Sequence, residues 1–218
     1  MRNNSLLVSE IFYSIQGESS FAGTPCVFIR LTGCNLRCSY CDTRYAYENG
    51  SEMEVASILQ AVEYFSCPLV EITGGEPLMQ PGTPELVSRL LERDFRVLVE
   101  TNGSLNIDCV DSRAVRIVDI KCPSSGEHGC NDLQNLKRLN PHDEIKFVIG
   151  DKEDFNYAKQ MLSLIPEKPG MERHIHFSPV SGRLNPKDLA MWILDDHLPV
   201  RLNLQLHRII WPEEERGR

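Results

Sequence analysis

The stretch GCNLRCSYCDT, residues Gly33 to Thr43, places three cysteines in a C-x3-C-x2-C pattern. Thiolates this close in sequence can bind one metal centre when the backbone between them forms a short loop around it. A structural zinc site or a closed iron–sulfur cluster normally has four protein ligands. The three ligands here, Cys34, Cys38 and Cys41, therefore indicate a centre with one position open to another molecule.

The segments on either side of this loop predict a βα unit. The apolar run from Cys26 to Leu31 predicts a strand that ends at the loop. Apolar residues at helical spacing predict an amphipathic helix over 55–65, and a short apolar strand over 69–73 runs into the sequence GGEP at 74–77. Active sites of βα-barrels lie at the carboxyl ends of the strands, so the loop and the GGEP turn are expected on one rim.

The same alternation continues to the end of the chain. Asn185 followed by Pro186 is typical of a helix start. Alternating strands and helices predict right-handed βαβ units and a mostly parallel sheet. About six such strands are too few for a closed eight-stranded barrel, so we expect an α/β fold of the partial, shortened (β/α)6 type. Further strands are predicted over 8–12, 96–100, 115–120, 144–149, 174–177 and 200–206, and further helices over 84–93, 133–139, 155–165 and from residue 186.

Composition narrows the class of protein. A chain of 218 residues with 41% hydrophobic content can bury one sizeable core, so we expect a single domain over 1–218. The net charge of −8 argues against a broad nucleic-acid surface or an anionic membrane as the main partner. The sequence shows neither a signal peptide nor a membrane span, which predicts a cytoplasmic protein.

The remaining five cysteines form no second tight group. In a reducing compartment they are more typical of buried side chains than of disulfides. Cys122 and Cys130 lie in one stretch and leave open a shared metal site. For the trio itself, a zinc site completed by a distant cysteine or histidine, or a chance spacing, stays open on spacing alone. The five are Cys26, Cys67, Cys109, Cys122 and Cys130.

With Tyr40 before its last cysteine, the loop resembles the signature of the radical S-adenosylmethionine (SAM) superfamily. The resemblance implies a radical SAM barrel and a [4Fe–4S] cluster whose open iron binds SAM, with release of a 5′-deoxyadenosyl radical on reduction. It also assigns Gly74, Gly75 and Glu76 to the cofactor. Consecutive glycines allow a ligand to approach the backbone closely. Taken alone, the same sequence is also typical of an ordinary strand-to-helix turn.

Further segments resemble the 7-carboxy-7-deazaguanine synthase family. These are FYSIQGES at 12–19, ETNGS at 100–104 and DIKCPSSGE at 119–127, together with Arg30 and the CDT triplet at 41–43. The resemblance implies a carbon–nitrogen lyase of queuosine biosynthesis, a pathway of tRNA modification. Its reaction converts 6-carboxy-5,6,7,8-tetrahydropterin into 7-carboxy-7-deazaguanine by ring contraction with loss of ammonia. It also implies a homodimer that uses magnesium and a reductant such as flavodoxin.

The family pattern assigns roles to individual residues and names no acid or base, because SAM supplies the radical. A pterin acid presents a polar planar edge and a carboxylate, which suit amides, backbone groups and a bidentate arginine. Thr43 matches the magnesium position. The substrate-binding set is Ile15, Gln16, Gly17, Arg30, Thr101 and His207, and the SAM-binding set is Tyr40, Gly74, Gly75, Glu76, Gly103, Lys121, Ser124, Ser125, Ser178 and Ser181.

Two positions depart from the family pattern, and two other functions stay open. Ser19 replaces a glycine, so the local backbone is expected to differ. Six residues follow Pro212 in the segment that closes over substrate in relatives, which puts any contact from a chain-terminal carboxylate in doubt. The alternatives are a glycyl-radical-enzyme activase with the same radical chemistry, and a metal-binding or electron-carrying module without catalysis.

Overall fold

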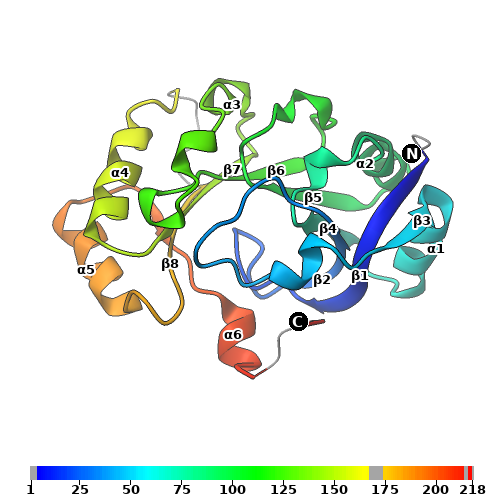
Figure 1. Ribbon diagram of the computed structural model, residues 1–218, viewed down its shortest axis with the longest axis horizontal. Coiled ribbons are helices and arrows are strands. Elements are labelled where there is room, and N and C mark those ends of the chain that lie inside the picture. Colours follow the sequence, from blue (N-terminus) through cyan, green and yellow to red (C-terminus); the bar gives the residue numbers. More distant parts are fainter. Residues whose placement is uncertain (1–3, 167–173, 214–215, 218) are drawn as a thin grey trace.

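The structure is a computed structural model, and it describes residues 4–166, 174–213 and 216–217. Its described strands form one open sheet in the order β3-β1-β2-β4-β5-β6-β7-β8-β9 (Figure 1). Neighbours from β2 to β9 run parallel, whereas β1 is antiparallel to both β2 and β3. The strands are β1 (Ser5–Ile15), β2 (Pro25–Leu31), β3 (Ser51–Glu54), β4 (Leu69–Gly74), β5 (Arg96–Thr101), β6 (Val115–Asp119), β7 (Glu144–Ile149), β8 (Ile175–Pro179) and β9 (Arg201–Leu202).

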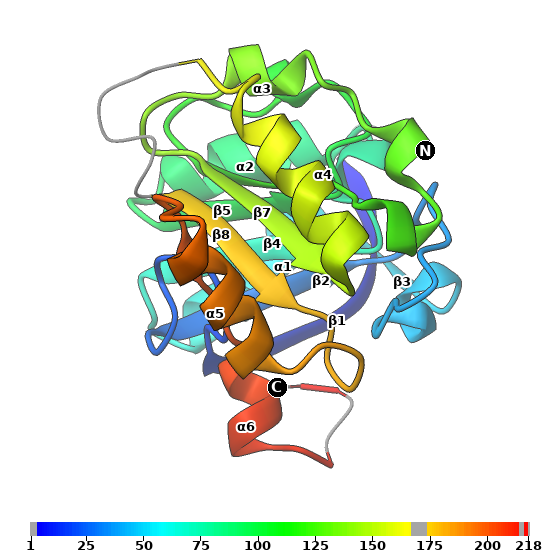
Figure 2. The ribbon, with the colours of Figure 1, turned by 90° about the vertical axis from the view of Figure 1, so that its left-hand side faces the viewer.

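Helices cover the outer face of the parallel strands, and Figure 2 shows α4 and α5 lying over β7 and β8. Asn185 accepts a hydrogen bond from the Lys187 amide at 2.9 Å, which confirms the predicted start of α5. No described helix has the length and apolarity needed to cross a bilayer. The helices are α1 (Val55–Tyr64), α2 (Thr83–Leu91), α3 (Asn135–Arg138), α4 (Lys152–Leu162), α5 (Pro186–Asp195) and α6 (Leu206–Ile210), with 3-10 turns at Arg44–Tyr47, Pro77–Met79, Ile107–Cys109, Pro123–Ser125 and His128–Cys130.

Two segments differ from the predicted elements. The strand predicted over 200–206 is wrong beyond Leu202, because the chain leaves the sheet there and α6 begins at Leu206. The backbone amide of Leu206 donates instead to the carbonyl of Gly17 at 3.0 Å. Strand β3 was not predicted, because its largely exposed sequence SEME lacks an apolar pattern, and its pairing with β1 is what makes it a strand.

The two faces of the parallel sheet differ in polarity. Side chains alternate along a strand. In β4, Val70 and Ile72 join the apolar core under the helices, whereas Glu71 and Thr73 line a cavity on the other face. In β7, the odd-numbered residues are likewise core and Lys146 lines the cavity. The inner face of this open barrel is therefore a polar surface available to ligands.

Candidate active site

A cavity of about 510 Å³ lies over the inner face of the sheet. Its wall includes all three cysteines of the loop and the carboxyl ends of several parallel strands. The structure thus brings together segments that are far apart in the sequence. Of the predicted site residues, Ile15, Gln16, Gly17, Arg30, Cys34, Cys38, Tyr40, Cys41, Thr43, Gly74, Gly75, Thr101, Lys121, Ser178, Ser181 and His207 line this cavity.

Four predicted cofactor residues lie behind the wall: Glu76, Gly103, Ser124 and Ser125. Glu76 is fully buried, and its carboxylate accepts from the Asn102 amide at 2.6 Å and from the Thr101 hydroxyl at 2.8 Å. Burial raises its pKa despite these hydrogen bonds. Glu76 therefore holds the end of β5 in place. Gly103, at φ +71°, makes the tight turn that follows.

The backbones of β2 and β4 meet closely below the cysteine loop. The Glu76 amide donates to the Gly33 carbonyl at 2.7 Å, and the Gly75 amide donates to the Leu31 carbonyl at 3.0 Å. A Cβ atom added to Gly75 would lie 1.9 Å from the Gly33 carbonyl oxygen. Glycine at this position is therefore required for the loop and the GGEP turn to share one rim.

The stretch after β6 supports the cysteine loop from the other side. The Ser39 amide donates to the Ser125 carbonyl at 2.9 Å, and the Ser39 hydroxyl donates to the Ser124 carbonyl at 2.7 Å. The Arg37 amide donates to Glu127 at 2.7 Å. Ser124 and Ser125 thus act on the cysteine loop through their carbonyls.

The three thiols lie on one short loop and line the cavity, as the ligands of an iron–sulfur cluster would. Within the described residues, no group of three or more His, Cys, Asp or Glu side chains has the geometry to hold one metal ion. The three cysteines are free and partly exposed to the cavity. Around Cys34, the Leu36 amide lies 3.5 Å and the Asn102 side-chain amide 3.7 Å from the sulfur. Donors of this kind commonly surround cluster sulfurs.

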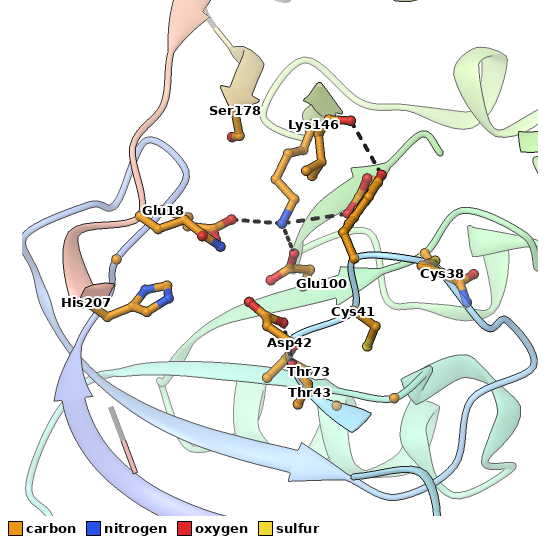
Figure 3. Close-up of a pocket in the computed structure, with 18 of the residues that line it drawn as sticks. Glu18, Cys38, Cys41, Asp42, Thr43, Thr73, Glu100, Lys146, Ser178 and His207 are labelled. Carbon is orange, nitrogen blue, oxygen red and sulfur yellow. Dashed lines mark hydrogen bonds and ion pairs between the residues drawn. The ribbon is translucent and has the colours of Figure 1, made fainter. Parts of the chain in front are cut away.

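Lys146 is the centre of the polar part of the cavity, and the sequence analysis did not assign it. Its ammonium group donates to Glu18 at 2.8 Å and to Glu100 (Figure 3). It also lies 3.8 Å from Asp119. Burial lowers its pKa, but the three carboxylates outweigh burial and raise the pKa well above 10.5. Lys146 therefore stays charged, and a lysine inside the apolar strand sequence EIKFVI was the available signal.

Glu18 joins Lys146 to the C-terminal part of the chain. Its other carboxylate oxygen accepts from the Gln205 side chain at 2.6 Å. Burial raises the pKa of Glu18, but Lys146 and Gln205 outweigh burial and lower it, so the carboxylate stays ionised. His207 follows two residues after Gln205. Its ring packs closely against Gly17, and a Cβ atom added to Gly17 would lie 2.2 Å from Nδ1 of His207.

Arg30 lines the cavity on the β2 side. Its guanidinium donates through Nε to Glu10 at 2.8 Å and lies 5.7 Å from the Phe12 ring centroid and 5.9 Å from that of Tyr45. Nε is engaged, while the side chain as a whole still faces the cavity. An arginine held in this way presents a fixed fork to an anion.

Thr43 and Asp42 follow the last cysteine and also line the cavity. The Thr43 hydroxyl donates to Asp42 at 2.8 Å, and Arg208 of α6 donates to the other oxygen of Asp42 at 2.8 Å. Burial raises the pKa of Asp42, but these hydrogen bonds outweigh burial and lower it to about 2. Two oxygen groups therefore lie together where the loop meets α6, and such groups are the ligands that magnesium prefers.

Comparison with known proteins places the chain in a family. The Radical SAM superfamily model matches residues 28–118. A 7-carboxy-7-deazaguanine synthase of Chlorobaculum tepidum is 49% identical over 97% of both chains. Another, from Koribacter versatilis, is 43% identical over 96% of this chain and 99% of the relative.

A crystal structure of QueE from Escherichia coli shares the fold, with a TM-score of 0.76 over 92% of this chain and 94% of that chain, at 23% identity. The expected partial radical SAM barrel is thereby confirmed. Identity close to one half over nearly the whole chain shows the family directly. The chain belongs to the 7-carboxy-7-deazaguanine synthase family of the radical SAM superfamily.

Proposed function

We propose that this chain converts 6-carboxy-5,6,7,8-tetrahydropterin into 7-carboxy-7-deazaguanine, at the cavity shared by the cysteine loop and Lys146. The observation that carries the proposal is this single cavity, in which a three-thiol loop faces a cluster of fixed charges. The radical SAM family uses a [4Fe–4S] cluster and SAM. When bound, these groups supply the radical that starts the reaction.

The chain's own residues then bind and orient the substrate. Arg30 pairs with the substrate carboxylate, because this arginine of β2 lines the cavity next to the cysteine loop. The ionised Glu18 accepts hydrogen bonds from the amino and ring N–H groups of the pterin edge. Lys146 holds Glu18 and Glu100 in place and offsets part of their negative charge.

Magnesium binds, in this proposal, at the Thr43 hydroxyl, with Asp42 beside it. The electron comes from a small redox protein such as flavodoxin, and the chain works as a cytoplasmic homodimer that uses neither nucleic acid nor membrane as substrate. The chain folds as one domain over 1–218.

Anaerobic turnover is the decisive experiment. The reconstituted protein is incubated with the pterin acid, SAM and a one-electron reductant, with and without magnesium. We expect 7-carboxy-7-deazaguanine, in a yield that rises with magnesium. Formation of 5′-deoxyadenosine without any deazapurine would contradict the proposal and favour the activase alternative.

Iron and sulfide analysis gives an independent readout of the cluster. We expect Cys38→Ala to lose the absorbance of the four-iron cluster, whereas Cys109→Ala, on the exposed surface, retains it. One zinc and no iron in the wild-type protein, or an intact cluster in Cys38→Ala, would refute the ligand assignment.

The role of Arg30 is tested by Arg30→Ala. Loss of one charge-assisted pair predicts a rise in KM for the pterin acid of about tenfold or more, with unchanged 5′-deoxyadenosine formation in the absence of substrate. Arg113→Ala, at an exposed position, is the matched control. An unchanged substrate affinity would remove Arg30 from the site.

A further inference from the structure

The segment 16–24 between β1 and β2 carries Gln16, Gly17 and Glu18 to the cavity, and it is attached to β7 at two points. At the first point, Lys146 donates to Glu18 at 2.8 Å. At the second, Ser20 donates to Glu144 from both its backbone amide, at 3.0 Å, and its hydroxyl. Glu18 and Ser20 are two residues apart on the segment, and their partners Lys146 and Glu144 are two residues apart on β7.

This spacing fixes the register of the segment against the strand. Residues two apart in a β-strand point to the same side, so Glu144 and Lys146 both face the segment. Ser19 lies between the two attached residues and has a φ of +64°. A shift of the segment by one residue would break both attachments at once.

The second attachment, between Ser20 and Glu144, involves a buried carboxylate. Glu144 is fully buried, and its carboxylate lies 2.8 Å from Nε2 of His176, a residue of β8 that is 1% exposed. Burial raises the pKa of Glu144, but His176 and Ser20 outweigh burial and lower it. A buried carboxylate that loses its donors is strongly unfavourable, so Glu144 holds Ser20 firmly.

Glu144, Ser20 and His176 do not line the cavity. Their effect on a ligand must therefore pass through the segment that they hold. We propose that Glu144 is a positioning residue, whose contact with Ser20 holds segment 16–24 in the register that presents Gln16 and Glu18 to the substrate. This inference rests on the proposed function, since it assumes that segment 16–24 binds the pterin acid.

The test is a comparison of Ser20→Ala with wild type in the turnover assay. The variant keeps the amide donor and loses the hydroxyl donor, so the segment is loosened while its fold is retained. We expect KM for the pterin acid to rise about tenfold and kcat to change by less than about twofold. Reductive cleavage of SAM without substrate stays at the wild-type rate.

Three further variants complete the design. Ser20→Thr keeps the hydroxyl and is expected to restore KM, and Glu144→Gln, which removes the charge, is expected to raise KM as Ser20→Ala does. Ser163→Ala removes an exposed hydroxyl elsewhere and is the control. A wild-type KM in both Ser20→Ala and Glu144→Gln, with a lowered Tm alone, would overturn the positioning role. Absence of deazapurine from wild type would instead overturn the proposed function.

Discussion

Ser19, at the position where the family pattern has glycine, lies in the left-handed region of backbone conformation. Its φ of +64° is a conformation that glycine adopts more easily. The serine hydroxyl compensates in part, because it accepts a hydrogen bond from the Phe21 amide at 3.2 Å. Whether this backbone differs from that of relatives with glycine here stays a prediction.

Substitutions at Ser19 should separate backbone strain from the hydrogen bond. We expect Ser19→Gly to change the free energy of unfolding by less than about 1 kcal/mol, since relief of strain offsets the lost hydrogen bond. Ser19→Val should destabilise by about 2 kcal/mol, because a β-branched residue is poorly tolerated at positive φ. Denaturant titration of the three proteins measures both changes. Equal stability of the glycine and valine variants would contradict this account.

Glu71 is a buried carboxyl whose ionisation the fold opposes. Burial and the charges of Glu100 and Glu18 raise its pKa well above 4.5, although Lys146 acts in the opposite direction. The folded state therefore holds this proton over a range of pH in which the unfolded chain has released it. Stability accordingly falls as the pH rises from about 4.5 through the folded pKa.

Glu71→Gln should remove this loss of stability at higher pH. Glutamine is close in shape and can still accept from the Gln16 side chain, which donates to Glu71 in the wild type. We expect the variant to be more stable than wild type at about pH 8, by a margin that shrinks toward about pH 5. Glu85→Gln, on the exposed face of α2, is the control. A margin that does not vary with pH would refute the prediction.

Among the elements, α5 illustrates a structure set by local sequence. Its first turn is capped by Asn185, and Pro186 supplies a backbone angle suited to a helix start. We expect Asn185→Ala to lower the free energy of unfolding by about 1 kcal/mol, with kcat/KM unchanged. Asn156→Ala, at an exposed position inside α4, removes the same side chain without removing a cap, and should not destabilise. Equal losses in both variants would contradict the capping role.

At the scale of the whole molecule, the core has two clusters beneath one sheet. The first packs around β1, β2, β4 and β5, the second packs around β7 and β8, and β6 contributes residues to both. In the second cluster, the ring of Phe177 lies 5.5 Å from that of Phe147 and 5.9 Å from that of Phe155, both edge to face. Because continuous strand pairing joins the clusters, we expect them to unfold together.

Phe177→Ala tests this expectation and, with it, the single domain. Truncation of a fully buried phenylalanine should lower the free energy of unfolding by about 3–5 kcal/mol. Hydrogen exchange should then accelerate in the first cluster, at β4 and α2, as well as in the second. Leu194→Ala, at a position 67% exposed, is the control. Faster exchange confined to the second cluster would show two independently folding units.

The sequence by itself determined the cysteine loop, most of the strands and helices, and the family. These features depend on residues close together in the chain, such as the cysteine spacing, the apolar periodicity and the Asn185 cap. The predictions failed where a pairing partner decided the outcome, as at β3, and where a long-range contact ended an element, as at the carbonyl of Gly17 before α6.

Only the tertiary structure decided which polar groups share the cavity. Glu18 and Lys146 are 128 residues apart, and Gln205 and Glu18 are 187 apart. No local pattern links such pairs, and their pKa values depend on burial and on charges that the sheet brings together. The same holds for Ser20 and Glu144. The three thiols could be identified from the sequence because one short loop holds them. The charged surface opposite them forms only when the strands pair in register.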